Sequence, residues 1–173
     1  MRLSLISFIL ILIIISPVGA ISERVDRISE EIIENYQIEG DLKYYYKDLN
    51  GGAETRKYPF NRYGVILDSE FLQDTNDEEL KGLLAHELAH IEDYSSMTFP
   101  EFLLFGAIYI LFEDFQRDVE RETDKTAIGK GFGKELLAFR EYSLKSEDSA
   151  YVERVKKNYL SPEEIIEYSE GGI

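Results

Sequence analysis

The chain has no cysteine and only two histidines among its 173 residues. The absence of cysteine excludes disulfide bonds, thiolate metal ligands and a cysteine nucleophile. Basic residues are also scarce: 19 lysines and arginines stand against 34 aspartates and glutamates, which leaves a formal net charge of −15. Because so acidic a surface repels the phosphate backbone, we expect no nucleic-acid partner.

The length of the chain allows one domain with a real core and is too short for two. We assign this domain to residues 21–173. Residues 1–20 carry one basic residue, Arg2, then an almost unbroken apolar run and a small-residue site at Val18-Gly19-Ala20. This pattern predicts a secretory signal peptide or an uncleaved N-terminal membrane anchor, with a buried structural helix as the alternative. With a signal peptide or an anchor, the domain is secreted or membrane-anchored outside the cytoplasm.

The order of the predicted elements indicates an α+β fold. Residues 22–40 show helical periodicity, and residues 41–49 and 53–58 have the pattern of two strands joined by a hairpin turn. A third strand follows at about residues 65–67, and the remaining elements are helices at about 76–94, 98–125, 134–145 and 150–159. The glycines at 129, 131 and 133 predict a loop, and Ser161 and Glu164 predict a cap at the start of a last short helix. The sequence therefore predicts a small antiparallel sheet with an edge strand, packed on a mostly helical domain.

An apolar run, FLLFGAIYILF, occupies residues 102–112 within the predicted helix 98–125. At 1.5 Å per residue it covers about half of a bilayer's hydrocarbon core. We interpret it as a buried helix. The alternatives are a membrane-dipping helix, which would add to the membrane contact made by residues 1–20, and the interface of a homo-oligomer.

Both histidines lie in the segment LKGLLAHELAHIEDY, where His86, Glu87 and His90 form the pattern His-Glu-x-x-His. Residues four apart share one face of an α-helix, so the two imidazoles can bind one metal ion and Glu87 can reach a water on that metal. We expect a capping box of Thr75 and Glu78 to start this helix. Its core stripe is offset from the histidine face and consists of Leu80, Leu84, Leu88 and Ile91. The alternative is a pair of histidines with no metal.

A catalytic zinc site needs three protein ligands and an open fourth position. Because the chain has no other histidine and no cysteine, the third ligand must be a carboxylate. The acids after the motif are Glu92, Asp93, Glu101, Glu113, Asp114, Asp118, Glu120, Glu122 and Asp124. Glu120 and Asp124 stand four apart on one helix face, so one could bind the metal while the other orients a histidine. Spacing alone leaves it equally open that residues 113–125 form a solvated, charged helix.

The segments LLAHELAHIED and ERETDKTAI together resemble the gluzincin metallopeptidases, in which a helix with His-Glu-x-x-His is followed by a helix with Glu-x-x-x-Asp. The sequence is most similar to the branch that includes HtpX and the CAAX prenyl protease, and in size it is similar to the minigluzincins. The resemblance covers about residues 59–140. It implies a zincin-like domain in which His86, His90 and Glu120 bind zinc, Glu87 is the general base and Asp124 orients His86.

The resemblance extends upstream to the segment NRYGVIL, which is similar to the edge strand that pairs with a substrate backbone in this family. It implies substrate contacts at Asn61, Gly64, Val65 and Ile66. Two features depart from the family's pattern: Thr123 stands where alanine is usual, and no histidine precedes Arg154 near the C-terminus. The residue that stabilises the oxyanion is therefore unassigned, and position alone suggests Tyr142, Tyr151, Arg140 or Arg154.

These features predict a zinc-dependent endopeptidase, with one Zn²⁺ per chain, that cleaves a peptide or protein substrate through a metal-activated water. One alternative is a zinc-binding protein without turnover, latent or inactive, that acts as a binding module, with residues 21–58 as a blocking element over the cleft. A carboxylate di-iron protein would need a second Glu-x-x-His on another helix, and His86 is the only other histidine. A further alternative is a membrane-anchored interaction module with incidental histidines.

Overall fold

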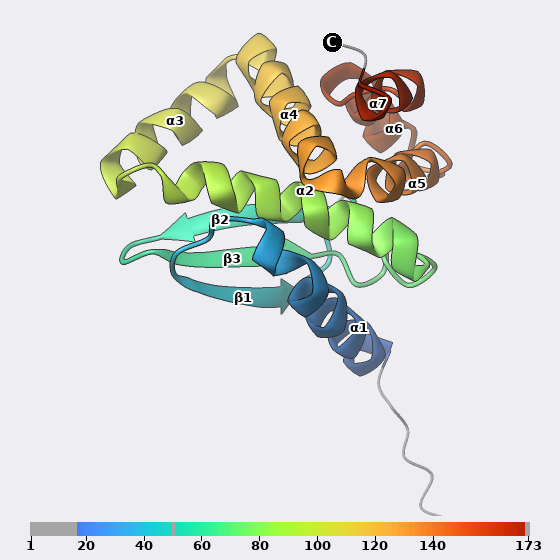
Figure 1. Cartoon of the computed structure of the whole chain (residues 1–173), viewed down its shortest axis with the longest axis horizontal. Coiled ribbons are helices and arrows are strands. Elements are labelled where there is room, and N and C mark those ends of the chain that lie inside the picture. Colours follow the sequence, from blue (N-terminus) through green and yellow to red (C-terminus); the bar gives the residue numbers. More distant parts are fainter. Residues whose placement is uncertain (1–16, 50, 172–173) are drawn as a thin grey trace, which may run out of the picture.

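In the computed structural model, which describes residues 17–49 and 51–171, a central helix α2 (Asp77–Ser95) separates a small sheet from a group of helices (Figure 1). The sheet consists of β1 (Asp41–Tyr46), β2 (Ala53–Tyr58) and β3 (Arg62–Leu67). The helices on the other side are α4 (Glu113–Ala127), α5 (Gly133–Ser143), α6 (Ser149–Asn158) and α7 (Pro162–Ser169). The predicted α+β class is confirmed.

Helix α1 (Pro17–Ile32) packs against α2 and contributes to the core. Its apolar stripe is almost fully buried and consists of Ile21, Val25, Ile28 and Ile32. The helix predicted at 22–40 ends earlier, in a 3₁₀ turn at Ile33–Asn35. Residues 1–16 of the predicted signal peptide or anchor lie outside the described residues. Among the residues that are described, no helix is both long and apolar enough to cross a membrane.

The strand order is β1-β3-β2, with β1 parallel and β2 antiparallel to β3. The predicted hairpin between residues 41–49 and 53–58 is therefore wrong, and the sheet is mixed rather than antiparallel. The reason lies in β3, whose residues from Tyr63 to Leu67 are all buried. A strand that is apolar on both faces gains most from a central position. β1 and β2 alternate between more and less exposed side chains, so they take the two edges.

The central position of β3 also corrects the predicted substrate contacts. Both edges of this strand pair within the sheet, so a substrate backbone cannot pair with Gly64, Val65 or Ile66. Asn61 lies in the turn between β2 and β3 at φ 49°, and its carbonyl accepts a hydrogen bond from the Asp41 N–H at 3.0 Å. The predicted backbone pairing of a substrate with Asn61, Gly64, Val65 and Ile66 is wrong. Among the described strands, β2 is the edge strand that lies along α2.

The central helix α2 is fixed at both ends by polar contacts. Its capping box lies one residue later than predicted: the Asn76 side chain accepts from the Glu79 N–H at 2.9 Å, and the Glu79 carboxylate accepts from the Asn76 N–H at 2.7 Å. At the other end the buried Lys57 of β2 donates to the carbonyls of Tyr94 and Met97, which places a cation at the helix C-terminus. The predicted core stripe is confirmed, with no exposed surface on Leu80, Leu84, Leu88 and Ile91.

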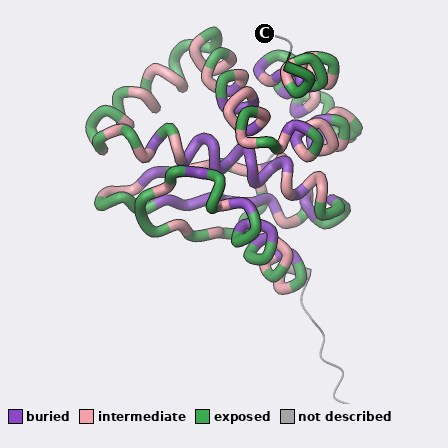
Figure 2. Tube along the Cα trace, in the orientation of Figure 1, coloured by how far each residue is buried: buried purple, intermediate pink, exposed green. Residues whose placement is uncertain are grey.

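The helix predicted at 98–125 is divided into α3 (Phe99–Leu111) and α4, because Phe112 between them has an extended backbone. The two helices diverge from this point (Figure 1). The interpretation of residues 102–112 as a buried helix is wrong, because no residue of α3 is buried (Figure 2). Four of its large apolar residues are more than half exposed, namely Leu103, Leu104, Ile110 and Leu111. Among the residues that the structure describes, the chain covers only one side of α3. The membrane-dipping and oligomer-interface interpretations both require an exposed apolar face, and they stay predictions.

The C-terminal helices follow the sequence pattern closely. A π-type turn at Ile128–Phe132, with Gly131 at φ 95°, occupies the segment predicted as a loop. The capping box of Ser161 and Glu164 that starts α7 is present as predicted. These helices carry Arg140 of α5 and Tyr159, just after α6, towards α2.

Candidate metal centre

Two adjacent turns of α2 and one turn of α4 bring His86, His90 and Glu120 together in the interior. Their exposed fractions are 5%, 6% and 3%. Glu120 Oε2 lies 3.1 Å from His86 Nε2 and 3.4 Å from His90 Nε2, and all three ligand atoms lie within 4.8 Å of one another. Tetrahedral zinc with ligands at about 2.0–2.1 Å places its donor atoms roughly 3.3–3.4 Å apart. The two distances from Glu120 match this spacing, and the three side chains are close enough to hold one ion. No other such group occurs within the described residues.

Asp124 orients His86 from the side away from these ligand atoms. Its Oδ1 lies 2.8 Å from His86 Nδ1, and its carboxylate also accepts from Arg140 at 2.9 and 3.0 Å and from the Leu160 N–H at 2.9 Å. Asp124 has no exposed surface, and Arg140 is 3% exposed. A proton on Nδ1 donated to Asp124 leaves Nε2 free to bind a metal, which is the usual arrangement for a liganding histidine.

Thr123, which stands between the candidate ligand Glu120 and Asp124 on α4, contacts the second histidine. Its hydroxyl donates to the Val119 carbonyl at 2.9 Å, so it can accept from His90 Nδ1, which lies 3.2 Å away. This contact favours the tautomer of His90 that presents Nε2 to Glu120. Thr123 therefore adds an orienting hydrogen bond to His90.

The ionisation states of Glu120, Asp124 and His86 favour the binding of a cation at the centre. Burial raises the pKa of Glu120, but the nearby His90 and His86 outweigh it and hold the pKa well below the ordinary value. Burial likewise raises the pKa of Asp124, and Arg140 and His86 bring it below its usual range. Burial lowers the pKa of His86, but hydrogen bonds to Asp124 and Glu120 outweigh burial and raise it to about 10. Both carboxylates are therefore ionised at neutral pH, and a metal would displace a proton from His86.

Glu87 lies beside the three candidate ligands and faces β2. It is 5% exposed, and its Oε2 accepts a hydrogen bond from the Thr55 hydroxyl at 2.5 Å. This contact fixes the carboxylate against the edge strand. Glu87, the predicted general base, therefore lies next to the three predicted ligands and is not itself one of them.

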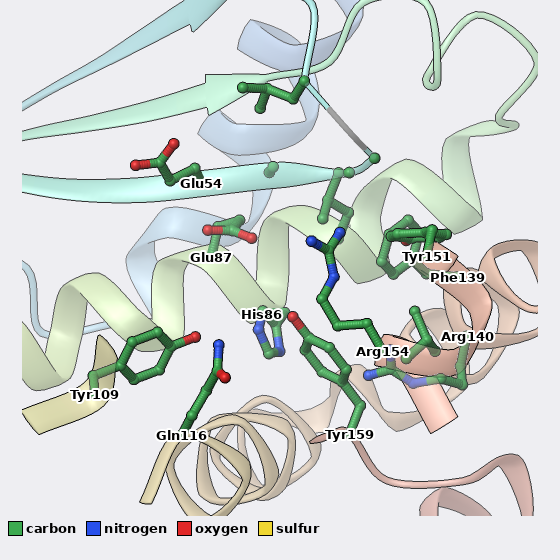
Figure 3. A pocket seen from close by; sticks show the side chains of 16 residues that line it. Glu54, His86, Glu87, Tyr109, Gln116, Phe139, Arg140, Tyr151, Arg154 and Tyr159 are labelled. Carbon is green, nitrogen blue, oxygen red and sulfur yellow. The ribbon is translucent and has the colours of Figure 1, made fainter. Parts of the chain in front are cut away.

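Two cavities meet at His86 and Glu87 and together form a groove along β2. The first, of about 340 Å³, extends towards α5 and α6 and is lined there by polar and aromatic residues such as Arg154, Tyr151 and Phe139 (Figure 3). The second, of about 410 Å³, extends towards α3. No residue of α1 or β1 lines either cavity, and β2 forms a wall. Leu49, Gly51 and Gly52 also line the first cavity, so the segment 21–58 reaches the cleft through Leu49 and residues 51–58, and its role as a blocking element stays a prediction.

Two tyrosines that sequence reasoning missed complete this groove, and both line both cavities. The Tyr109 hydroxyl, from α3, donates to Glu120 Oε1. The Tyr159 ring lies 5.5 Å from the His86 ring, and its hydroxyl points towards the groove (Figure 3). Burial and the charge of Glu120 raise the pKa of Tyr159 well above the usual range, so its hydroxyl keeps its proton at neutral pH. With 12 tyrosines in the chain, composition and spacing could not single these out.

The four residues suggested for the oxyanion differ in their surroundings. Tyr142 donates to the Phe71 carbonyl at 2.6 Å and lines neither cavity of the groove. Arg140 is held by Asp124. Tyr151 and Arg154 line the first cavity, on the side away from α3. Of the remaining acids after the motif, Glu122 is exposed and pairs with Lys125, so the choice of Glu120 over Glu122 agrees with the geometry.

No family model matches the chain, and no curated protein or solved structure matches it significantly. The resemblance to the gluzincins therefore rests on the quoted motifs and stays a prediction. The arrangement of His86, His90, Glu120, Asp124 and Glu87 rests on the geometry of this chain.

Proposed function

We propose that the protein is a zinc-dependent endopeptidase. The observation that carries the proposal is the buried group of His86, His90 and Glu120, whose ligand atoms lie within 4.8 Å of one another, beside Glu87 in an open groove. Two nitrogen ligands and one carboxylate oxygen suit zinc, and three protein ligands leave its fourth position open, as in hydrolytic sites. A zinc ion held there supplies Lewis-acid polarisation of the scissile carbonyl and lowers the pKa of water.

The chain's own residues would then carry the proton transfers. Glu87 accepts a proton from the attacking water and passes it to the departing amine. Because Thr55 occupies Oε2, the Oε1 atom of Glu87 is the one left for that proton. Tyr159, which keeps its hydroxyl proton, is placed beside His86 to donate a hydrogen bond to the developing oxyanion.

The groove suits an extended peptide. β2 is an edge strand among the described strands, and its residues from Ala53 to Tyr58 line the cavity that holds the candidate ligands. A substrate segment can add to such an edge through main-chain hydrogen bonds, which gives affinity without restricting its sequence. This assigns the strand-pairing role to β2, in place of residues 61–66.

The proposal is tested with the full chain, loaded with zinc and incubated with an unfolded protein substrate. We expect hydrolysis that a chelator abolishes and added zinc restores. Glu87→Gln should retain one zinc and lose hydrolysis by at least about 100-fold, the lower range for a general base. Glu122→Gln, which changes an exposed acid on α4, is the matched control and should behave as the wild type. Wild-type hydrolysis by Glu87→Gln would refute the mechanism, and zinc binding without hydrolysis by the wild type would favour the non-catalytic zinc-binding alternative.

A further inference from the structure

The second cavity of the groove, hereafter the α3 cavity, differs in chemistry from the rest of the candidate site. Beyond the metal ligands it is walled by apolar and aromatic side chains, namely Tyr94, Phe102, Phe105 and Ile110. The charged residues of β2 nearby have partners: Lys57 donates to carbonyls at the end of α2, and Arg56 pairs with Glu54 at 2.7 Å. The α3 cavity therefore presents an apolar surface to whatever lies beside the ligands.

The helix that forms this wall leaves space at one position. Gly106 lies within α3 and lines the α3 cavity, and a Cβ atom added there would meet no atom within 4 Å. A glycine inside a helix is less favourable than an alanine at the same position. Close packing does not require this glycine, so its effect is to keep the wall of the cavity open. That space suits a large side chain supplied by a ligand.

The direction of the groove follows from β2. This strand runs from Ala53, beside the first cavity, to Tyr58, beside the α3 cavity. A strand added antiparallel to β2, the slightly more stable arrangement, begins near Tyr58 and ends near Ala53. The α3 cavity then receives a side chain on the N-terminal side of the bond that faces Glu87. The first cavity, which Arg154 and Gln116 line, receives the side chains on the C-terminal side of that bond (Figure 3).

We propose that the α3 cavity selects peptides with a large apolar or aromatic side chain just before the scissile bond. This rests on the proposed function, because it names the substrate class of the same site. Burying a phenylalanine side chain rather than leaving it in water favours the bound state by about 10- to 100-fold. The residues that set the selectivity are Phe102, Phe105, Gly106 and Ile110.

The test uses two fluorogenic peptides that differ only in one residue, phenylalanine or alanine. The zinc-loaded wild type should cleave the phenylalanine peptide with a kcat/KM about 10- to 100-fold higher, and mass spectrometry should place the cut on the carboxyl side of phenylalanine. Gly106→Leu fills the cavity and should bring the ratio of the two rates close to one. Ala107→Leu, an exposed neighbour on α3 that does not line the cavity, should keep the wild-type ratio. Circular dichroism confirms that both variants fold.

Equal cleavage of the two peptides by the wild type, or an unchanged ratio in Gly106→Leu, would overturn the inference and leave the proposed function standing. A cut on the amino side of phenylalanine would overturn it as well. If the wild type cleaves neither these peptides nor an unfolded protein, the proposed function fails, and binding decides the inference. In that case Glu87→Gln should bind the phenylalanine peptide in fluorescence anisotropy and the double variant Glu87→Gln/Gly106→Leu should lose at least about tenfold in affinity. Equal binding would overturn it.

Discussion

Asp124→Asn separates the folding role of the buried carboxylate from its role at the metal. Asp124 serves three donors at once: His86 Nδ1, the Arg140 guanidinium and the Leu160 N–H. An asparagine of the same shape has one oxygen and one NH₂ group. If the oxygen faces His86, the NH₂ group points at Arg140 and Leu160. If the asparagine oxygen faces Arg140, its NH₂ group donates to His86 Nδ1. The imidazole proton then lies on Nε2, the atom that must bind the metal.

The loss of folding stability expected for Asp124→Asn follows from the burial of the ion pair. Arg140 is 3% exposed, and breaking a buried ion pair by removing one partner costs about 3–5 kcal/mol of folding free energy. Losing the group that orients a liganding histidine weakens metal binding by about 10- to 100-fold. In the double variant Asp124→Asn/Arg140→Met no unpaired guanidinium is left. We therefore expect it to recover most of the folding stability but none of the metal affinity.

The assay is urea unfolding followed by circular dichroism in the presence of chelator, together with zinc titration of the folded protein. Chelator removes the stabilisation that bound metal adds, so the unfolding measurement reports the ion pair alone. A loss below about 1 kcal/mol in Asp124→Asn would mean that the pair is not buried as described. Wild-type zinc affinity in the double variant would refute the role of Asp124 in orienting His86.

Three further predictions concern stability. Gly82→Ala should destabilise the fold by about 1–3 kcal/mol in urea, because its Cβ would lie 2.0 Å from the Glu135 carbonyl oxygen of α5. Gly106→Ala, facing open space, should instead raise the free energy of unfolding by up to about 1 kcal/mol. A change of the same sign in Gly82→Ala and Gly106→Ala would contradict this packing. A hydrogen bond from Arg121 lowers the pKa of Glu164, so this pair stabilises the protein above about pH 5 and is lost as pH falls through the lowered pKa. The stability difference between wild type and Glu164→Gln should therefore shrink on acidification, and a difference that is constant with pH would exclude the pair as its cause.

The sequence predicted best what depends on neighbouring residues. Helical periodicity placed Leu80, Leu84, Leu88 and Ile91 in the core. The four-residue spacing of Glu120 and Asp124 put both on one helix face, and the resemblance to the gluzincins, not the spacing, directed that face to His86. Caps marked the start of α7 correctly and that of α2 to within one residue. These signals are local, because they arise within one or two helical turns.

Features that depend on long-range packing were missed. The turn-like residues 50–52 suggested a hairpin, yet the more apolar β3 lies between the two strands. The apolar composition of residues 102–112 suggested burial, but within the described ranges 17–49 and 51–171 the chain covers only one side of α3. Tyr109 and Tyr159 reach the candidate site only through the angles at which their segments approach α2. No spacing rule could have identified them.

The proposed site depends first on the three ligands, and zinc titration of the full chain after chelator treatment tests this most directly. We expect one zinc per chain in the wild type, an affinity at least about 100-fold lower in Glu120→Ala, and wild-type affinity in Glu122→Ala. Absence of zinc binding by the wild type, or equal losses in the two variants, would contradict the assignment of His86, His90 and Glu120 as a metal centre.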